Sequence, residues 1–66
     1  MNAIINGEER RLDPDTTVAD VVRSLTSAES GVAVALNDDV VPRTAWAQTV
    51  VSPGDRVDVL TAVQGG

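Results

Sequence analysis

The chain contains no cysteine, histidine, lysine, tyrosine or phenylalanine. Without cysteine it has no disulfide, no thiolate nucleophile and no Cys-based metal cage. The absent residue types supply most of the general bases and covalent nucleophiles that work near neutral pH. Two pairs of acids, Asp13 with Asp15 and Asp38 with Asp39, stand in segments where Asp favours turns by bonding the local backbone. We therefore expect a protein that is not an enzyme by itself and that binds no metal or cofactor of its own.

Long apolar runs are also missing, since none approaches the roughly 20 residues that span a bilayer. The opening residues do not combine a basic segment with an apolar one, as a secretion signal would. All five cations are arginines and stand against ten acids, a net charge of −5 that repels nucleic acid. At 66 residues and 42% hydrophobic, we expect one folded cytoplasmic domain, monomeric when free, with no membrane or nucleic-acid partner.

Short strands are predicted wherever apolar and other residues alternate. Met1–Ile5 has this pattern, and Asn6-Gly7 predicts a tight hairpin turn because both residues tolerate positive φ. The returning strand is expected over Glu8–Leu12. Further alternation predicts strands over Val32–Leu36 and from Val57 almost to the end of the chain, with a short strand at 40–41 between them.

One main helix is predicted after the first hairpin. Thr17 is a plausible N-cap, and Asp20 lies three positions later, where a first-turn acid is favoured. The apolar stripe of this helix follows at helical spacing: Val18, Val21, Val22 and Leu25. A single helical turn is expected around Trp46, the only aromatic residue, whose ring we expect in the core.

The predicted order of elements is two strands, a helix, two strands, a helical turn and a last strand. Such an order is typical of an α+β fold in which one helix lies across one face of a mixed sheet. We expect the last strand near the middle of the sheet, because its alternation is the longest and cleanest.

The sequence ends in Gly65-Gly66, a pair that chance would place there in about one chain in two hundred. A frayed end or a cloning remnant is the plain alternative. Without a Cβ at either position, the backbone can thread a narrow channel in a partner. Residues 63–66 would span about 13 Å when extended. The carboxylate of Gly66 is a poor acylating group until ATP-dependent chemistry activates it.

Three segments, GVAVALNDDVVPRTAWAQ, SPGDRVDV and TAVQGG, resemble the sulfur carrier proteins of thiamin biosynthesis, the ThiS family of ubiquitin-like β-grasp domains. The resemblance implies a β-grasp domain over residues 1–62 and a flexible tail over 63–66. It also implies that an E1-like adenylyltransferase uses ATP to adenylate Gly66. A sulfur donor such as a cysteine desulfurase then converts Gly66 to a thiocarboxylate, which gives sulfur to thiazole synthase.

Other functions remain open at this point. The Gly-Gly end is shared with ubiquitin and with the small subunit of molybdopterin synthase. The chain is therefore also compatible with a sulfur carrier for molybdopterin or another pathway, a non-covalent ubiquitin-like adaptor, or a modifier conjugated to lysines. The Phe-rich and Pro-rich approach that we associate with molybdopterin carriers is missing before Gly65, which favours thiazole formation.

Residues near the end of the chain are the predicted contacts with partners. Val63, Gln64 and Gly65 would thread into the partner and carry Gly66 to its site. If Val57 and Val59 point inward, the alternate residues of the last strand face out and suggest a docking surface, which Ile4 of the first strand would extend. The outward residues are Asp58, Leu60 and Ala62. A lone surface leucine is the plain alternative for Leu60.

Overall fold

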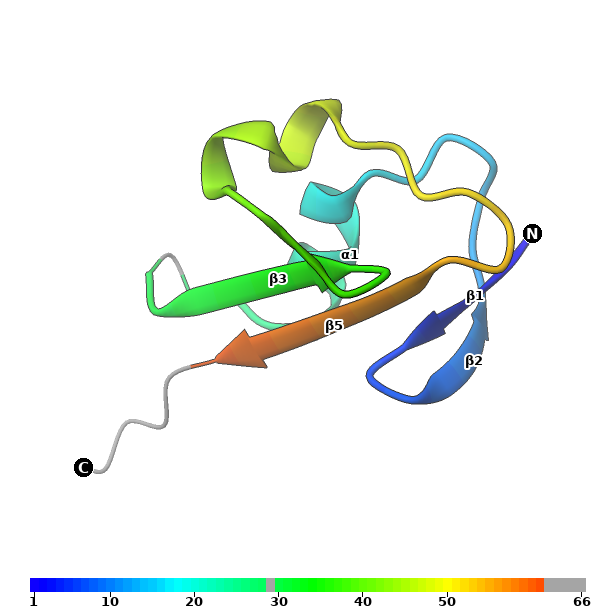
Figure 1. Cartoon of the computed structure of the whole chain (residues 1–66), viewed down its shortest axis with the longest axis horizontal. Helices are drawn as coiled ribbons and strands as arrows, with labels where there is room; N and C mark the ends of the chain where they lie inside the picture. The colour runs from blue at the N-terminus through cyan, green and yellow to red at the C-terminus, as the bar shows by residue number, and fades with distance from the viewer. Residues whose placement is uncertain (29, 62–66) are drawn as a thin grey trace.

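The sheet has five strands in the order β2-β1-β5-β3-β4 in the computed structural model, which describes residues 1–28 and 30–61. β1 and β5 run parallel, while the other neighbouring strands are antiparallel (Figure 1). The predicted α+β fold with a mixed sheet is confirmed, and so is the central place of the last strand. The strands are β1 (Asn2–Ile5), β2 (Glu8–Arg11), β3 (Val32–Leu36), β4 (Asp39–Val41) and β5 (Arg56–Thr61).

The predicted hairpin between β1 and β2 is confirmed. Asn6 and Gly7 have φ of 50° and 82°, the positive values that a tight two-residue turn requires. The strand after the turn ends at Arg11, one residue before the expected Leu12. Pairing nevertheless continues past it, because the backbone N–H of Leu12 donates to the carbonyl of Met1 at 2.7 Å and the Met1 amino group donates back at 2.9 Å.

Helix α1 (Val18–Leu25) begins as the sequence predicts. The hydroxyl of Thr17 accepts the backbone N–H of Asp20 at 3.2 Å, and the Asp20 carboxylate accepts the N–H of Thr17 at 3.1 Å. This reciprocal pair satisfies two N–H groups that the helix itself leaves unbonded. The bond from the Thr17 backbone, helped by Arg23 at 2.5 Å, lowers the pKa of Asp20 below its usual value.

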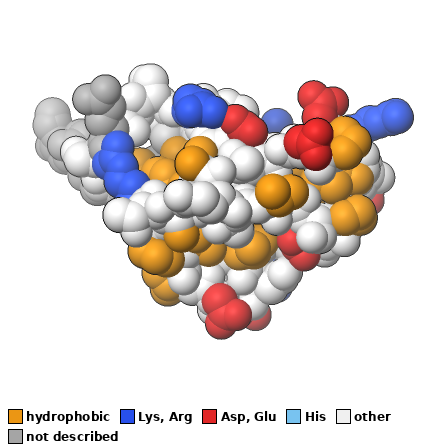
Figure 2. All heavy atoms as spheres, turned by 90° about the horizontal axis from the view of Figure 1, so that it is seen from above, with side chains coloured by type: hydrophobic (Ala, Val, Ile, Leu, Met, Phe, Trp, Pro, Cys, Tyr) orange, Lys and Arg blue, Asp and Glu red, His pale blue; other side chains and the backbone are white. Residues whose placement is uncertain are grey.

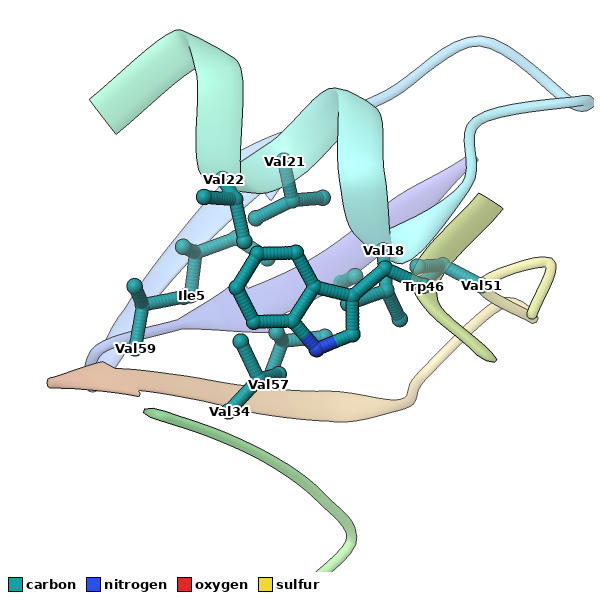
Figure 3. Packing of buried hydrophobic residues seen from close by; sticks show 10 residues of the cluster. Ile5, Val18, Val21, Val22, Val34, Trp46, Val51, Val57 and Val59 are labelled. Atoms are coloured by element: carbon teal, nitrogen blue, oxygen red, sulfur yellow. The ribbon is translucent and has the colours of Figure 1, made fainter. Parts of the chain in front are cut away.

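The hydrophobic core lies between α1 and one face of the sheet (Figure 3). The indole of Trp46 packs among the valines of both layers and is only 8% exposed, while its Nε1 donates to the carbonyl of Val41 at 2.9 Å. Trp46 belongs to the short 3-10 helix η1 (Arg43–Gln48). Its predicted role in packing is confirmed. The buried residues are Ala3, Ile5, Val18, Val21, Val22, Val34, Trp46, Val51, Val57 and Val59.

The surface seen from above in Figure 2 carries its apolar side chains in separate groups among charged and polar atoms.

None of the helices within residues 1–28 and 30–61 is long and apolar enough to cross a membrane.

Candidate functional site: the base of the C-terminal segment

β5 leads from the middle of the sheet directly to the C-terminal residues. It pairs with β1 on one side and β3 on the other, and it ends at Thr61 (Figure 1). The predicted partner-contacting residues Ala62, Val63, Gln64, Gly65 and Gly66 lie outside the described residues. The structure therefore defines the strand that precedes this segment.

The inward side of β5 is anchored in the core. Val57 is fully buried and Val59 is 7% exposed, which confirms that these residues point inward. Burying a valine side chain fully stabilises a fold by about 1.5–3 kcal/mol. Since Val57 and Val59 pack beneath α1, the start and middle of β5 are held firmly in the domain (Figure 3).

Two asparagine side chains bond to the backbone of β5 from the turns beside it. Oδ1 of Asn6 accepts the N–H of Val59 at 2.7 Å, and Oδ1 of Asn37 accepts the N–H of Arg56 at 2.9 Å. The Asn37 amide also donates to Oδ1 of Asp55 at 3.0 Å. Sequence reasoning assigned Asn6 to a turn but missed both of these bonds, because the partners are far away in sequence.

Charged groups line the outward side of β5 near its start. The guanidinium of Arg56 is paired with the carboxylate of Asp38 in the β3–β4 turn, and its Nε lies 3.4 Å from Oδ2 of Asp58. All three side chains are substantially exposed, so such pairs contribute little to stability, typically about 0–1 kcal/mol. Asp58 is thus partly neutralised by a neighbour on its own strand.

Leu60 lies on the face of the sheet that points away from α1. It is 69% exposed, as expected for a candidate docking residue, and it pairs with Ala33 of β3. Ile4 lies on the same face and is 37% exposed, but it pairs with Arg56. Because Arg56 precedes Leu60 by four residues along β5, the structure puts Ile4 and Leu60 on one face without bringing them side by side.

A groove of about 530 Å³ lies between α1 and η1, on the helical side of the sheet. Arg23 and Arg43 border it, and Trp46 contributes to its wall. The Arg43 guanidinium lies 5.7 Å from the centre of the Trp46 ring, within reach of a cation–π contact.

Metal-binding groups do not gather anywhere in the described residues. Within residues 1–28 and 30–61 there is no cluster of three or more acidic, histidine or cysteine side chains that could hold a metal ion. The element nearest to the predicted partner-contacting residues is β5, which ends at Thr61, shortly before the two glycines.

This architecture defines a class of small α+β domains, the β-grasp fold, and solved structures of that class match it closely. The crystal structure of the thiamine biosynthesis protein ThiS from Geobacter metallireducens has a TM-score of 0.79 and 33% identity, over 100% of both chains. The solution structure of a thiamine biosynthesis protein from the same organism gives a TM-score of 0.81 at 33% identity, covering 100% of this chain and 88% of that one.

Sequence comparison then identifies the family. The ThiS family pattern matches residues 3–66. The sulfur carrier protein ThiS of Escherichia coli K12 is 30% identical over the full length of both chains. A thiazole synthase of Paramagnetospirillum magneticum is 35% identical over all 66 residues, although the match spans only 20% of that longer protein. The chain belongs to the ThiS family of sulfur carrier proteins in thiamin biosynthesis, which are carriers rather than enzymes.

Proposed function

We propose that the carboxyl group of Gly66 carries the sulfur. An E1-like adenylyltransferase would join this carboxylate to the AMP part of ATP, releasing pyrophosphate. A persulfide on a donor such as a cysteine desulfurase would then attack the acyl carbon with its terminal sulfur, and AMP would leave. A second thiol would attack the inner sulfur, forming a disulfide and releasing the Gly66 thiocarboxylate, which gives its sulfur to thiazole synthase. Adenylation is needed because a free carboxylate resists nucleophilic attack.

The observation that carries this proposal is the position of β5. This central strand, anchored by Val57 and Val59, ends at Thr61, only five residues before Gly66. The ThiS family pattern extends to residue 66 and so includes both glycines. Glycine has no Cβ, which lets Gly65 and Gly66 enter a channel as narrow as an extended backbone. Val63 and Gln64 would lie at its entrance.

The direct test is intact-mass spectrometry after incubation with ATP, the adenylyltransferase and the sulfur donor. The proposal predicts a gain equal to the mass of sulfur minus that of oxygen, located on Gly66. A chain lacking only Gly66 is the matched control and should gain no mass. A non-covalent adaptor would function without Gly66 and would show no gain in either form.

Thiazole synthase is proposed as the acceptor of the sulfur. The thiazole synthase of P. magneticum contains a region similar to this whole chain, which supports a functional link between carrier and synthase. For this carrier, sulfur transfer would require binding to a thiazole synthase. The ATP belongs to the adenylyltransferase, so the carrier itself needs no bound cofactor.

Leu60 is proposed to dock the adenylyltransferase, together with Asp58 and Ala62. Its 69% exposure leaves a large apolar side chain in water near the C-terminal end of β5. Leu60→Arg should fold normally and lose binding to the enzyme. Val50→Arg is a matched control, because Val50 is also exposed, at 52%, but pairs with Thr17 at the start of α1. Equal binding by both variants would refute this role for Leu60.

A further inference from the structure

The side of β5 that faces β1 is only partly covered. β1 pairs with β5 at two positions, Ile4 with Arg56 and Ile5 with Val57. The chain then turns away at Asn6 into the hairpin. Asn6 makes the last bonds on this side: its N–H donates to the Val57 carbonyl at 2.9 Å, and its Oδ1 accepts from Val59.

The directions of the backbone groups show what remains uncovered. The carbonyl of Arg56 accepts from Asn37 on the β3 side, whereas Val57 and the N–H of Val59 bond toward β1. Backbone groups alternate sides along a strand, so the Val59 carbonyl and the Thr61 N–H also point toward β1. Neither group has a hydrogen-bond partner within the described part of the chain. We call these two groups the open edge of β5.

The other edges of the sheet are protected in ways that this one is not. The outer strand β2 carries two glutamates and two arginines, and the outer strand β4 is only three residues long. Charges and short length both discourage pairing with another chain. The open edge of β5 is bordered instead by Val59, Leu60 and Thr61, which are uncharged, and Leu60 is largely exposed.

We propose that an extended segment of the adenylyltransferase pairs with the open edge of β5 as an added strand. A carbonyl and an N–H at strand spacing are satisfied together by an extended backbone, which is the basis of strand addition between proteins. The partner strand would take the place beside β5 that the chain leaves after Asn6, with an apolar side chain against Leu60. This inference rests on the proposed function and names how the same partner holds the base of the C-terminal segment.

Strand addition at this point has a mechanical consequence for the carrier. Thr61 is the last residue of β5, so a partner bond at its N–H would fix the direction of the chain at the end of this strand. Fixing that direction reduces the conformational freedom that must be lost when the terminus enters the enzyme.

The test compares Thr61→Pro with Thr61→Val for binding to the purified adenylyltransferase. Proline removes the N–H at the open edge, whereas valine keeps it with a side chain of similar shape. The β3 ladder should survive in both, since the Thr61 N–H points away from β3. Losing one backbone hydrogen bond should weaken binding of Thr61→Pro about fivefold, with Thr61→Val within about twofold of the wild type. Equal binding by the two variants would overturn the inference.

Hydrogen exchange of the wild-type protein tests strand addition even if Thr61→Pro does not fold. The Thr61 amide should exchange quickly in the free carrier and at least about tenfold more slowly in the complex. Unchanged exchange in a complex that has formed would refute strand addition. Mass spectrometry of wild-type Gly66 tests the proposed function separately, because thiocarboxylate formation can succeed whether or not this edge is paired.

Discussion

Replacing Asn6 tests how the turn beside β1 holds the C-terminal strand. Asn6 combines a φ of 50° with a side-chain bond to the N–H of Val59, a partly buried donor. Asn6→Gly keeps the turn and loses that bond, which should lower the free energy of unfolding by about 1–2 kcal/mol. Asn6→Ala also loses the short polar side chain that lets asparagine tolerate the left-handed region, at a further cost of about 1 kcal/mol.

These losses are large for a domain of this size. At 66 residues, a stability of roughly 3–10 kcal/mol is expected, so Asn6→Ala would remove a substantial part of it. Asn6→Asp is the control, because aspartate keeps an acceptor oxygen and tolerates the same backbone conformation. Urea unfolding followed by Trp46 fluorescence measures all three variants. The reasoning is refuted if Asn6→Gly is as stable as the wild type, or if glycine and alanine have equal effects.

Three further changes test the helical layer. Thr17→Ala removes the N-cap of α1 and should lower stability by about 1 kcal/mol, or the melting temperature by about 4–8 °C in calorimetry. Because the pKa of Asp20 is lowered by folding, its stabilising effect is complete above the unfolded value of 3.8 and disappears as the pH falls through the folded value. Acid unfolding of Asp20→Asn should therefore lack this contribution, and identical acid profiles would contradict it. Trp46→Phe leaves the Val41 carbonyl without its donor and opens a gap, so denaturant titration by circular dichroism should show a loss of about 2 kcal/mol.

Local patterns in the sequence were sufficient for most of the architecture. Asn6-Gly7 predicted a turn because its backbone requirement lies within the two residues themselves. Thr17 and Asp20 predicted the start of α1 because a capping box closes over three residues. Alternation from Val57 to Leu60 predicted which side chains of β5 enter the core, since the period of a strand is two.

Features that depend on register could not be predicted in this way. The bond between Asn6 and Val59 joins residues 53 positions apart, and it exists only because β1 and β5 lie side by side. The same pairing sets Ile4 beside Arg56. Ile4 and Leu60 therefore share a face of the sheet but do not lie side by side on it, which the sequence alone could not show. The open edge of β5 likewise follows from where β1 stops.

The central position of β5 means that the sheet can form only after this strand has been synthesised. A ribosome makes β5 after the other four strands of the sheet, yet β1 and β3 have no direct pairing with each other and need it between them. Contacts between strands far apart in sequence form slowly, and these cannot form before β5 exists. A product that stops before residue 56 would therefore lack an intact sheet. Any enzyme that selects the folded domain would thereby also select against prematurely ended chains.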